Sequence, residues 1–138
     1  MKAEELRIGN YVKIDSGIGK VVSLMSNTFC NECANDDYNI TIEMEDGTFR
    51  EEEEVKVECI PLTEEILLNC GFEYVNPDNK SYGMLSPDDG KGNRHRIMCF
   101  DNEFRMVLNT WNYLPLKYVH ELQNLFFSFT KKELNIQL

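Results

Sequence analysis

Residues 61–72, Pro61-Leu62-Thr63-Glu64-Glu65-Ile66-Leu67-Leu68-Asn69-Cys70-Gly71-Phe72, form a complete helix signature that divides the sequence in two. Thr63 is a residue type that caps helix N-termini, and the two glutamates after it lie where the helix dipole favours negative charge. Gly71 suits the left-handed conformation that often follows a helix, and Phe72 supplies the apolar contact that accompanies it. We therefore predict a helix here, after an element that Pro61 ends.

The sequence before this helix reads as β-structure. Residues 38–44 alternate between apolar and polar side chains, as half-buried strands do. Turn residues at 15–19 and the Asp46-Gly47 pair separate the strand-like segments. The predicted strands cover residues 6–14, 20–25, 38–44 and one or two segments within 48–60, where Val55, Val57 and Cys59 would share one face. Short strands joined by tight turns indicate a small, strongly bent sheet or barrel over residues 1–60.

Four consecutive glutamates at residues 51–54 lie in this β-region. Adjacent side chains of a strand point to opposite faces, so these carboxylates cannot converge on one calcium ion. We interpret them as the solvated edge of a sheet, where like charges discourage pairing with other chains.

After the helix, the sequence returns to β-structure and ends in a second helix. Strand-like segments cover residues 73–76, 81–85, 94–100 and 103–109, the last two as a hairpin across Asp101-Asn102. Pro115 is a favourable first helical residue. Apolar residues follow at helical spacing and predict a stripe that faces the core, namely Leu116, Val119, Leu122, Phe126 and Phe129. Leu125 and Phe127 broaden this stripe, so we also expect this C-terminal helix to be able to contact a second subunit.

The order of these elements predicts an α+β fold. Residues 1–60 form the bent sheet or barrel, and residues 61–138 form a helix, an antiparallel sheet and a C-terminal helix. We expect the two parts to share one compact unit, because 138 residues are typical of a single domain.

The net charge of −10 lies mostly in the first part of the sequence. Residues 1–60 contain 6 basic and 14 acidic side chains, and residues 61–138 contain 8 and 10. This balance repels nucleic-acid phosphates and argues against general nucleic-acid binding. The sequence has no apolar run of the ~18–20 residues that a membrane helix needs. Its first residues have no apolar signal region, so we expect a cytoplasmic protein with reduced cysteines and no membrane association.

Cys30 and Cys33, in the stretch Phe29-Cys30-Asn31-Glu32-Cys33, have the spacing of a metal-binding or redox pair. A structural zinc site needs a second pair of ligands, but no other cysteines lie close to each other in the sequence. A redox pair would lie at a helix N-terminus, whereas this pair lies in a polar, loop-like segment. We favour two exposed thiols, and zinc and redox chemistry remain the alternatives. The remaining cysteines, Cys59, Cys70 and Cys99, read as buried small apolar residues.

The sequence contains no pattern that supports catalysis. It has no G-x-S-x-G nucleophile motif, and Gly17-Ile18-Gly19-Lys20 lacks the spacing and the hydroxyl residue of a phosphate loop. Residues 17–20 are therefore predicted to form a β-turn. We expect a protein that is not an enzyme and that needs no cofactor.

One basic island stands out in this acidic sequence. Arg94 and Arg96 would share a face of a predicted strand, and Arg105 would join them across the hairpin. With Trp111 nearby in the sequence, these cations could bind a phosphate or carboxylate ligand, such as a nucleotide. The alternative is that they pair with acidic neighbours on the surface of the sheet.

Several stretches resemble a family of small uncharacterised proteins of Bacteroidetes bacteria and of their phages and prophages. The resemblance rests on residues 5–10 (ELRIGN), 61–72 (PLTEEILLNCGF), 117–127 (KYVHELQNLFF) and 133–136 (ELNI). The family pattern has a glycine after the threonine that follows the last helix, whereas Lys131 follows Thr130 in this sequence. The family has no established activity, so the resemblance implies a mobile-element setting and assigns no functional residue.

These observations favour a non-enzymatic, acidic binding protein of a phage or mobile element. Its partner would be a host or phage protein with a basic surface. The alternative is a protein that binds a small anionic ligand through Arg94, Arg96, Arg105 and Trp111.

Overall fold

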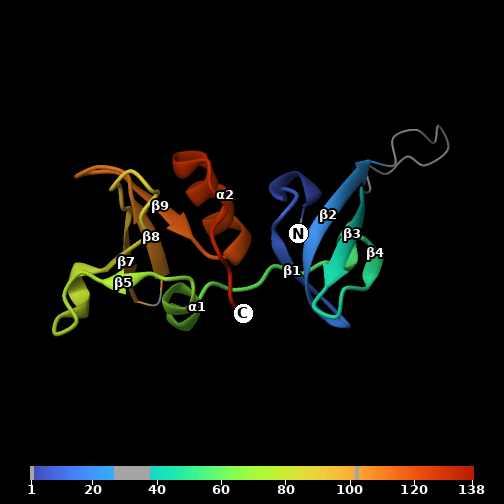
Figure 1. Ribbon diagram of the computed structural model, residues 1–138, viewed down its shortest axis with the longest axis horizontal. Helices are drawn as coiled ribbons and strands as arrows, with labels where there is room; N and C mark the ends of the chain where they lie inside the picture. Colours follow the sequence, from blue (N-terminus) through green and yellow to red (C-terminus); the bar gives the residue numbers. More distant parts are fainter. Residues whose placement is uncertain (1, 27–37, 102) are drawn as a thin grey trace. The chain divides into compact units, whose positions relative to one another are not determined.

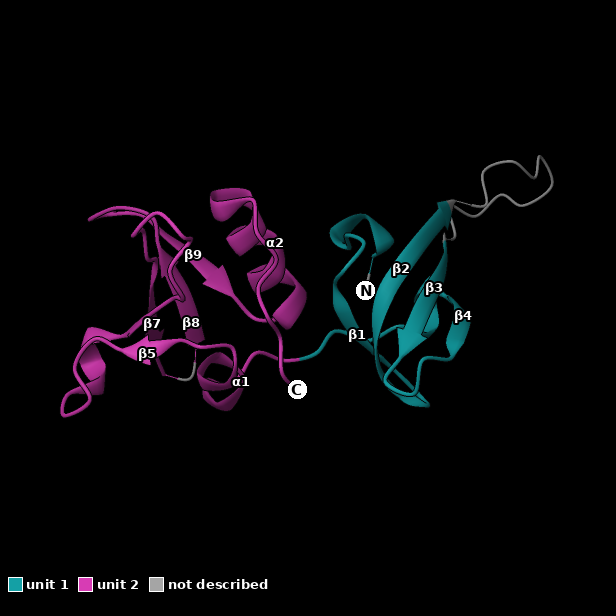
Figure 2. Ribbon diagram, in the orientation of Figure 1, with its two compact units in different colours: residues 1–60 teal, residues 61–138 magenta. Residues whose placement is uncertain are grey.

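The computed structural model describes residues 2–26, 38–101 and 103–138 of the chain (Figure 1). The protein divides into two compact units, Met1–Ile60 and Pro61–Leu138 (Figure 2). Each unit contains one antiparallel sheet, and the helices α1 and α2 both belong to the second unit. The predicted α+β class is confirmed.

The first unit is built on a four-stranded antiparallel meander in the order β1-β2-β3-β4. Tight turns join its neighbouring strands β1 and β2, and β3 and β4, and Gly17 and Gly47 adopt the positive φ angles of +131° and +80° that these turns require. A bulge between Val21 and Ser23 interrupts the pairing of β2 with β3, which strengthens the local twist. The elements of the unit are η1 (Ala3–Glu5), β1 (Tyr11–Ile14), β2 (Gly17–Ser26), β3 (Tyr38–Met44), β4 (Phe49–Glu53) and η2 (Glu54–Lys56), where η denotes a 3₁₀ helix.

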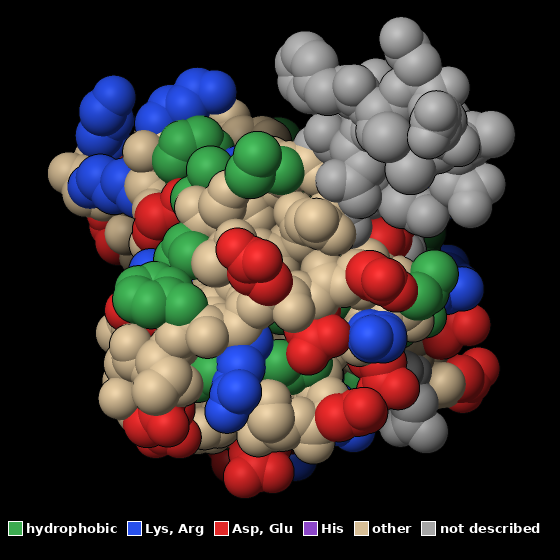
Figure 3. All heavy atoms as spheres, turned by 90° about the vertical axis from the view of Figure 1, so that its right-hand side faces the viewer, with side chains coloured by type: hydrophobic (Ala, Val, Ile, Leu, Met, Phe, Trp, Pro, Cys, Tyr) green, Lys and Arg blue, Asp and Glu red, His purple; other side chains and the backbone are tan. Residues whose placement is uncertain are grey.

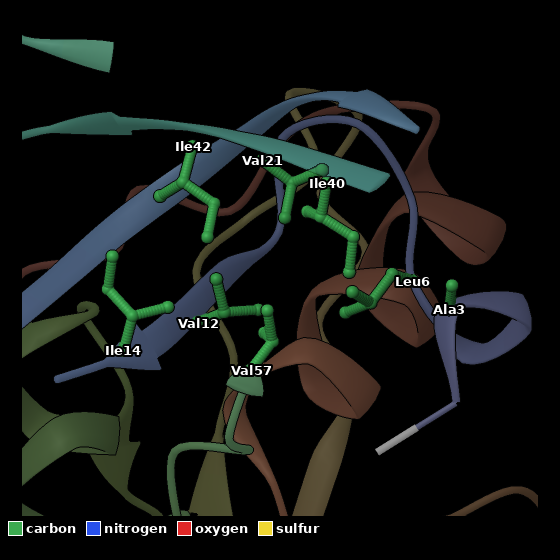
Figure 4. Packing of buried hydrophobic residues seen from close by; sticks show 8 residues of the cluster. All are labelled: Ala3, Leu6, Val12, Ile14, Val21, Ile40, Ile42 and Val57. Atoms are coloured by element: carbon green, nitrogen blue, oxygen red, sulfur yellow. The ribbon is translucent and has the colours of Figure 1, made fainter. Parts of the chain in front are cut away.

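The core of the first unit comes from the alternating side chains of these strands. Figure 4 shows eight buried apolar residues that converge on one face of the sheet, with the N-terminal segment beside them. They are Ala3, Leu6, Val12, Ile14, Val21, Ile40, Ile42 and Val57. The period of two that predicted strand 38–44 therefore reflects the burial of Ile40 and Ile42.

The sheet of the first unit does not close into a barrel, so that part of the prediction is wrong. The chain turns in η2 after β4, which leaves Val55 78% exposed and buries Val57. Only Glu58 then reaches β1, where it forms a single bridge with Lys13. Val55 and Val57 consequently do not share a face, because a 3₁₀ turn replaces the strand expected there.

The second unit contains a five-stranded antiparallel sheet in the order β5-β6-β7-β8-β9. Buried side chains alternate with partly exposed ones along β8, so this sheet has one buried face and one open face. The elements are α1 (Glu64–Asn69), β5 (Glu73–Tyr74), η3 (Lys80–Tyr82), β6 (Met84–Leu85), β7 (Arg96–Phe100), β8 (Glu103–Val107), β9 (Tyr113–Leu116) and α2 (Val119–Thr130).

Helix α1 forms as its sequence predicts. The backbone N–H of Ile66 donates to Thr63 Oγ1 at 3.2 Å, so Thr63 is the N-cap. Gly71 follows the helix with a φ angle of +91°, and Phe72 is buried. Local capping signals therefore sufficed to locate this element.

Helix α2 begins later than the sequence suggested. Pro115 lies in β9, opposite Arg105, because an edge strand tolerates a residue without an N–H on its unpaired side. The helix starts at Val119, where Glu121 Oε2 accepts the backbone N–H groups of Lys117 and Tyr118 at 2.7 and 3.1 Å.

Four of the five positions predicted for the apolar stripe are buried, but only three of them lie on α2. These are Val119, Leu122 and Phe126. Leu116 is buried in β9 instead, and Phe129 on α2 is 43% exposed. The ring of Phe129 instead stacks on His95, with the ring centres 4.8 Å apart. In the described part of the chain, no helix is long and apolar enough to cross a membrane.

Candidate functional site

The open face of the five-stranded sheet, called the outer face below, is the candidate functional site. Directly paired residues of antiparallel strands point to the same side, so the strand register assigns each side chain to a face. Met84, Ile97, Phe104, Met106 and Leu116 are buried on the inner face. The outer face carries Glu73, Leu85, Arg96, Met98, Phe100, Glu103, Arg105, Val107, Tyr113 and Pro115.

Apolar and aromatic side chains dominate the outer face. Phe100 and Tyr113 are 46% and 45% exposed, and Met98 and Val107 between them are half-buried. Strand β7 therefore places large apolar groups on both of its faces, although only the inner face is buried in the core. A surface of this kind on a globular protein marks a site of interaction more often than chance.

Two arginines share the outer face with these apolar groups. Arg105 lies opposite Met98, its guanidinium binds Glu103 at 3.2 Å, and its charge lies 5.7 Å from the ring centre of Phe100. Arg96, at the start of β7, is exposed and has no ion pair among the described residues. Arg96 is thus a cation that the described part of the chain leaves available to a partner.

The other two members of the predicted basic island lie elsewhere. Arg94 precedes β7, where its Nε donates to the carbonyl of Ser86 at 2.6 Å and its guanidinium binds Glu73 at 3.2 Å. Trp111 lies in the turn between β8 and β9 and is 87% exposed. The structure therefore places Arg96 and Arg105 together on one face, holds Arg94 in a loop, and leaves Trp111 at the end of the sheet.

The first unit presents a carboxylate-rich surface. Glu51 and Glu53 are exposed on β4, the edge strand, as the interpretation of residues 51–54 requires. Figure 3 shows carboxylate side chains spread over the face of the protein that it presents. Glu54 differs from its neighbours, because its carboxylate accepts the backbone N–H of Ala3 and so fixes the N-terminal segment.

A hollow of about 400 Å³ lies at the turns of the first unit, beside Asp46, Thr48 and Arg50. The backbone N–H and the hydroxyl of Thr48 donate to Asp46 Oδ1 at 2.9 and 2.6 Å. These hydrogen bonds lower the pKa of Asp46 and commit its carboxylate to the turn. The hollow is therefore not a stronger candidate for a binding site than the outer face.

The cysteines give no metal centre in the described part of the chain. Cys30 and Cys33 lie outside the described residues, and no group of three metal-ligating side chains occurs within 2–26, 38–101 and 103–138. Cys70 is buried, as predicted, and burial raises the pKa of its thiol. Cys99 is exposed and Cys59 is half-buried, so the prediction that both are buried is wrong.

Sequence reasoning located the two arginines of the outer face but missed its apolar residues. The signal was present in residues 96–100, Arg-Ile-Met-Cys-Phe, where apolar side chains occupy both alternating positions. A strand that is apolar on both faces is either covered twice or binds a partner. The second aromatic residue, Tyr113, could not be assigned because Pro115 was predicted to begin a helix, which left Tyr113 outside every predicted strand.

No protein-family model, curated protein or solved structure matches this chain.

Proposed function

We propose that this chain is a non-enzymatic binding protein whose second unit binds a protein partner on the outer face. One observation carries the proposal, namely that exposed Phe100 and Tyr113 and half-buried Met98 lie on the same face as Arg96 and Arg105. Aromatic residues, methionine and arginine are the types enriched in protein interfaces. Aromatic residues and arginine are also the types that most often carry the binding energy.

The residues of the outer face indicate which groups a partner must present to bind there. A partner would pack apolar side chains against Phe100 and Tyr113 and would offer a carbonyl or carboxylate oxygen to Arg96. The net charge of −10 favours encounter with a basic protein, because complementary charge raises the rate of association. The resemblance to proteins of mobile elements makes a host protein the first class of partner to test.

The proposal is tested by capture of partners from host lysate with three forms of the full chain. The wild type is compared with the double variant Phe100→Ala/Tyr113→Ala and with the control Tyr82→Ala. Tyr82 is a matched control because it is an aromatic residue of the same unit, 50% exposed, in η3 rather than on the outer face. We expect the double variant to weaken binding of the captured protein at least about 30-fold and the control to retain it.

Three outcomes would contradict the proposal. Repeated capture without any bound protein would do so, as would a partner that binds the double variant as tightly as the wild type. Circular dichroism of each variant must first show an unchanged fold, so that lost binding reports the surface rather than unfolding. A captured nucleic acid in place of a protein would also contradict the assigned class of partner.

A further inference from the structure

The first unit has an open sheet edge of its own, formed by strand β4. Figure 1 shows β4 at the edge of the sheet, where it pairs with β3 on one side only. The strand runs for five residues, Phe49–Glu53, and contains no proline. An edge strand of this kind presents unpaired backbone groups, to which an extended segment of another protein can add as a further strand.

The register of the sheet shows which backbone groups of β4 point outward. The backbone N–H of Met44 donates to the carbonyl of Thr48 at 2.8 Å, so these two residues form a hydrogen-bonded pair. Hydrogen-bonded pairs alternate with non-bonded pairs along antiparallel strands. Arg50 and Glu52 therefore bond to Ile42 and Ile40 of β3, their direct partners. The N–H and C=O groups that point away from β3 belong to Phe49, Glu51 and Glu53.

The other sheet edges in the described part of the chain are less accessible to an added strand. In β1, Lys13 exchanges two backbone hydrogen bonds with Glu58, at 3.0 and 2.8 Å. Strand β5 has only two residues. Strand β9 contains Pro115, which has no N–H to donate, and the N–H of Leu62 donates to the carbonyl of Lys117 just beyond this strand. Among these edges, β4 thus offers the longest run of outward-pointing backbone groups.

The side chains of β4 indicate the charge of a strand that fits beside it. Glu51 and Glu53 are exposed, lie on the face of the sheet opposite the core, and form no ion pair among the described residues. Phe49 lies on the same face and is 63% exposed. A second copy of β4 would bring like charges together, which opposes pairing. A strand with basic side chains at alternate positions would instead bring a cation opposite each carboxylate.

We propose that the edge of β4 binds an extended, basic segment of a partner protein, which adds to the first sheet as an antiparallel strand. Lysine or arginine side chains of this segment lie opposite Glu51 and Glu53, and an apolar side chain lies opposite Phe49. The site belongs to the first unit and does not depend on the partner proposed for the outer face.

The test uses the full chain and a synthetic peptide, acetyl-Thr-Lys-Val-Lys-Val-Leu-Thr-amide, whose two lysines and leucine match Glu53, Glu51 and Phe49 in antiparallel register. Amide hydrogen exchange of β4 is followed by NMR. In the free protein, we expect the amide of Glu51 to exchange rapidly and that of Glu52 slowly, because only the latter bonds to β3. Peptide at ten times its dissociation constant should slow exchange at Glu51 about 10-fold.

Two N-methylated peptides separate strand addition from simple attraction of charges. One carries the methyl group on the backbone nitrogen of the second lysine, which would donate to β4. The other carries it on the following valine, whose N–H would point away from β4. The two peptides have the same charge and composition. We expect the first to bind at least about 10-fold more weakly than the second, because it loses a hydrogen bond and directs a methyl group at the strand.

Variants of the protein test the role of the carboxylates. We expect Glu51→Gln/Glu53→Gln to weaken binding of the unmodified peptide about 5-fold, since two cross-strand charge pairs are lost. The control Glu65→Gln/Asp78→Asn removes the same charge from two exposed positions of the second unit and should retain the affinity of the wild type.

Four results would overturn the proposal. One is the absence of saturable binding of the unmodified peptide up to about 5 mM, an affinity too weak for a specific site. Another is equal binding of the two N-methylated peptides, which would reduce the interaction to charge alone. A third is equal weakening by the two double variants. The fourth is protection of the Glu51 amide that rises with protein concentration without peptide, which would show that a second copy occupies the edge.

Discussion

At the scale of single residues, buried polar groups explain parts of the sequence that composition alone cannot. Asn10 is fully buried, and its Oδ1 accepts the backbone N–H of Arg7 at 2.7 Å. Gly9 beside it has a φ angle of +97°, which only glycine adopts readily. The Leu-Arg-Ile-Gly-Asn stretch at residues 6–10 is therefore explained by one tight turn that leads the chain into β1.

Replacing Asn10 by alanine should destabilise the first unit. The variant leaves the backbone N–H of Arg7 without its acceptor, which costs about 1–3 kcal/mol in the free energy of unfolding. Denaturation by urea measures this difference. Asn39→Ala, on an exposed position of β3, is the control and should change stability by less than about 0.5 kcal/mol. Equal effects of the two variants would refute the role assigned to Asn10.

The loop before β7 holds a carboxylate whose titration should report the loop structure. The side-chain amide of Asn93 donates to Asp89 Oδ2 at 2.9 Å. This bond, followed by the backbone N–H of Lys91, lowers the pKa of Asp89 below its ordinary value of 3.8. Because the pKa of Asp89 is lower in the folded protein, its carboxylate stabilises the fold at pH values above the ordinary pKa of 3.8. This stabilisation is lost as the pH falls through the pKa that Asp89 has in the folded protein.

Replacing Asn93 by alanine should raise the pKa of Asp89 towards 3.8, since the largest cause of its lowering is removed. Carboxyl carbon chemical shifts followed by NMR between neutral and acidic pH measure the pKa directly. Asp46 in the first unit is the control, because its pKa is lowered by Thr48 rather than by Asn93 and should be the same in both proteins. An Asp89 pKa that does not move would show that the hydrogen bond from Asn93 is unimportant in solution.

At the scale of elements, the sequence predicted those with complete local signals and failed where distant strands decide the outcome. Helix α1 carried its own caps in Thr63 and Gly71 and was located correctly. Strand β9 was missed because Pro115 is equally suited to the start of a helix and to an edge strand. The choice depends on pairing with β8, which no local pattern contains.

Gly83, the residue before β6, lies very close to the backbone of β7. Gly83 has a φ angle of +80°, and a Cβ there would lie 2.4 Å from the carbonyl oxygen of Ile97. Gly92 has a similar φ angle of +85° but open space around it. Both glycines therefore have a backbone conformation that would be strained in a residue with a side chain, and they differ in the space around them.

We expect Gly83→Ala to destabilise the second unit by about 3 kcal/mol or more, and Gly92→Ala by about 1 kcal/mol. Thermal and urea unfolding of the two variants measure the difference. The larger effect arises because the backbone of β7 must move to admit the methyl group. If the two variants are equally stable, the close approach of β6 to β7 is incorrect.

At the scale of the whole molecule, the sequence predicted the α+β class and the two arginines of the outer face, but not its apolar residues. Alternation along a hairpin was enough to place Arg96 and Arg105 on one side of a strand pair. It could not place Arg94, because β7 starts only at Arg96, after a loop in which Ser86 accepts hydrogen bonds from Arg94 Nε and from the backbone N–H of His95.

The sequence also could not predict whether the sheet of the first unit closes into a barrel. Residues 54–60 have strand composition, yet a 3₁₀ turn after β4 redirects the chain, and only Glu58 bridges to β1. Whether a bent sheet closes depends on the register of its first and last strands. That register is a property of the whole unit rather than of either strand.

The outer face is tested most directly by NMR of two methionine methyl groups during titration with a captured partner. Met98 lies on the outer face, and Met84 is buried on the inner face of the same sheet. Binding at the outer face predicts that the Met98 signal shifts or broadens in proportion to the bound fraction while the Met84 signal stays in place. A partner that perturbs Met84, or any part of the first unit, and leaves Met98 unchanged would contradict the account.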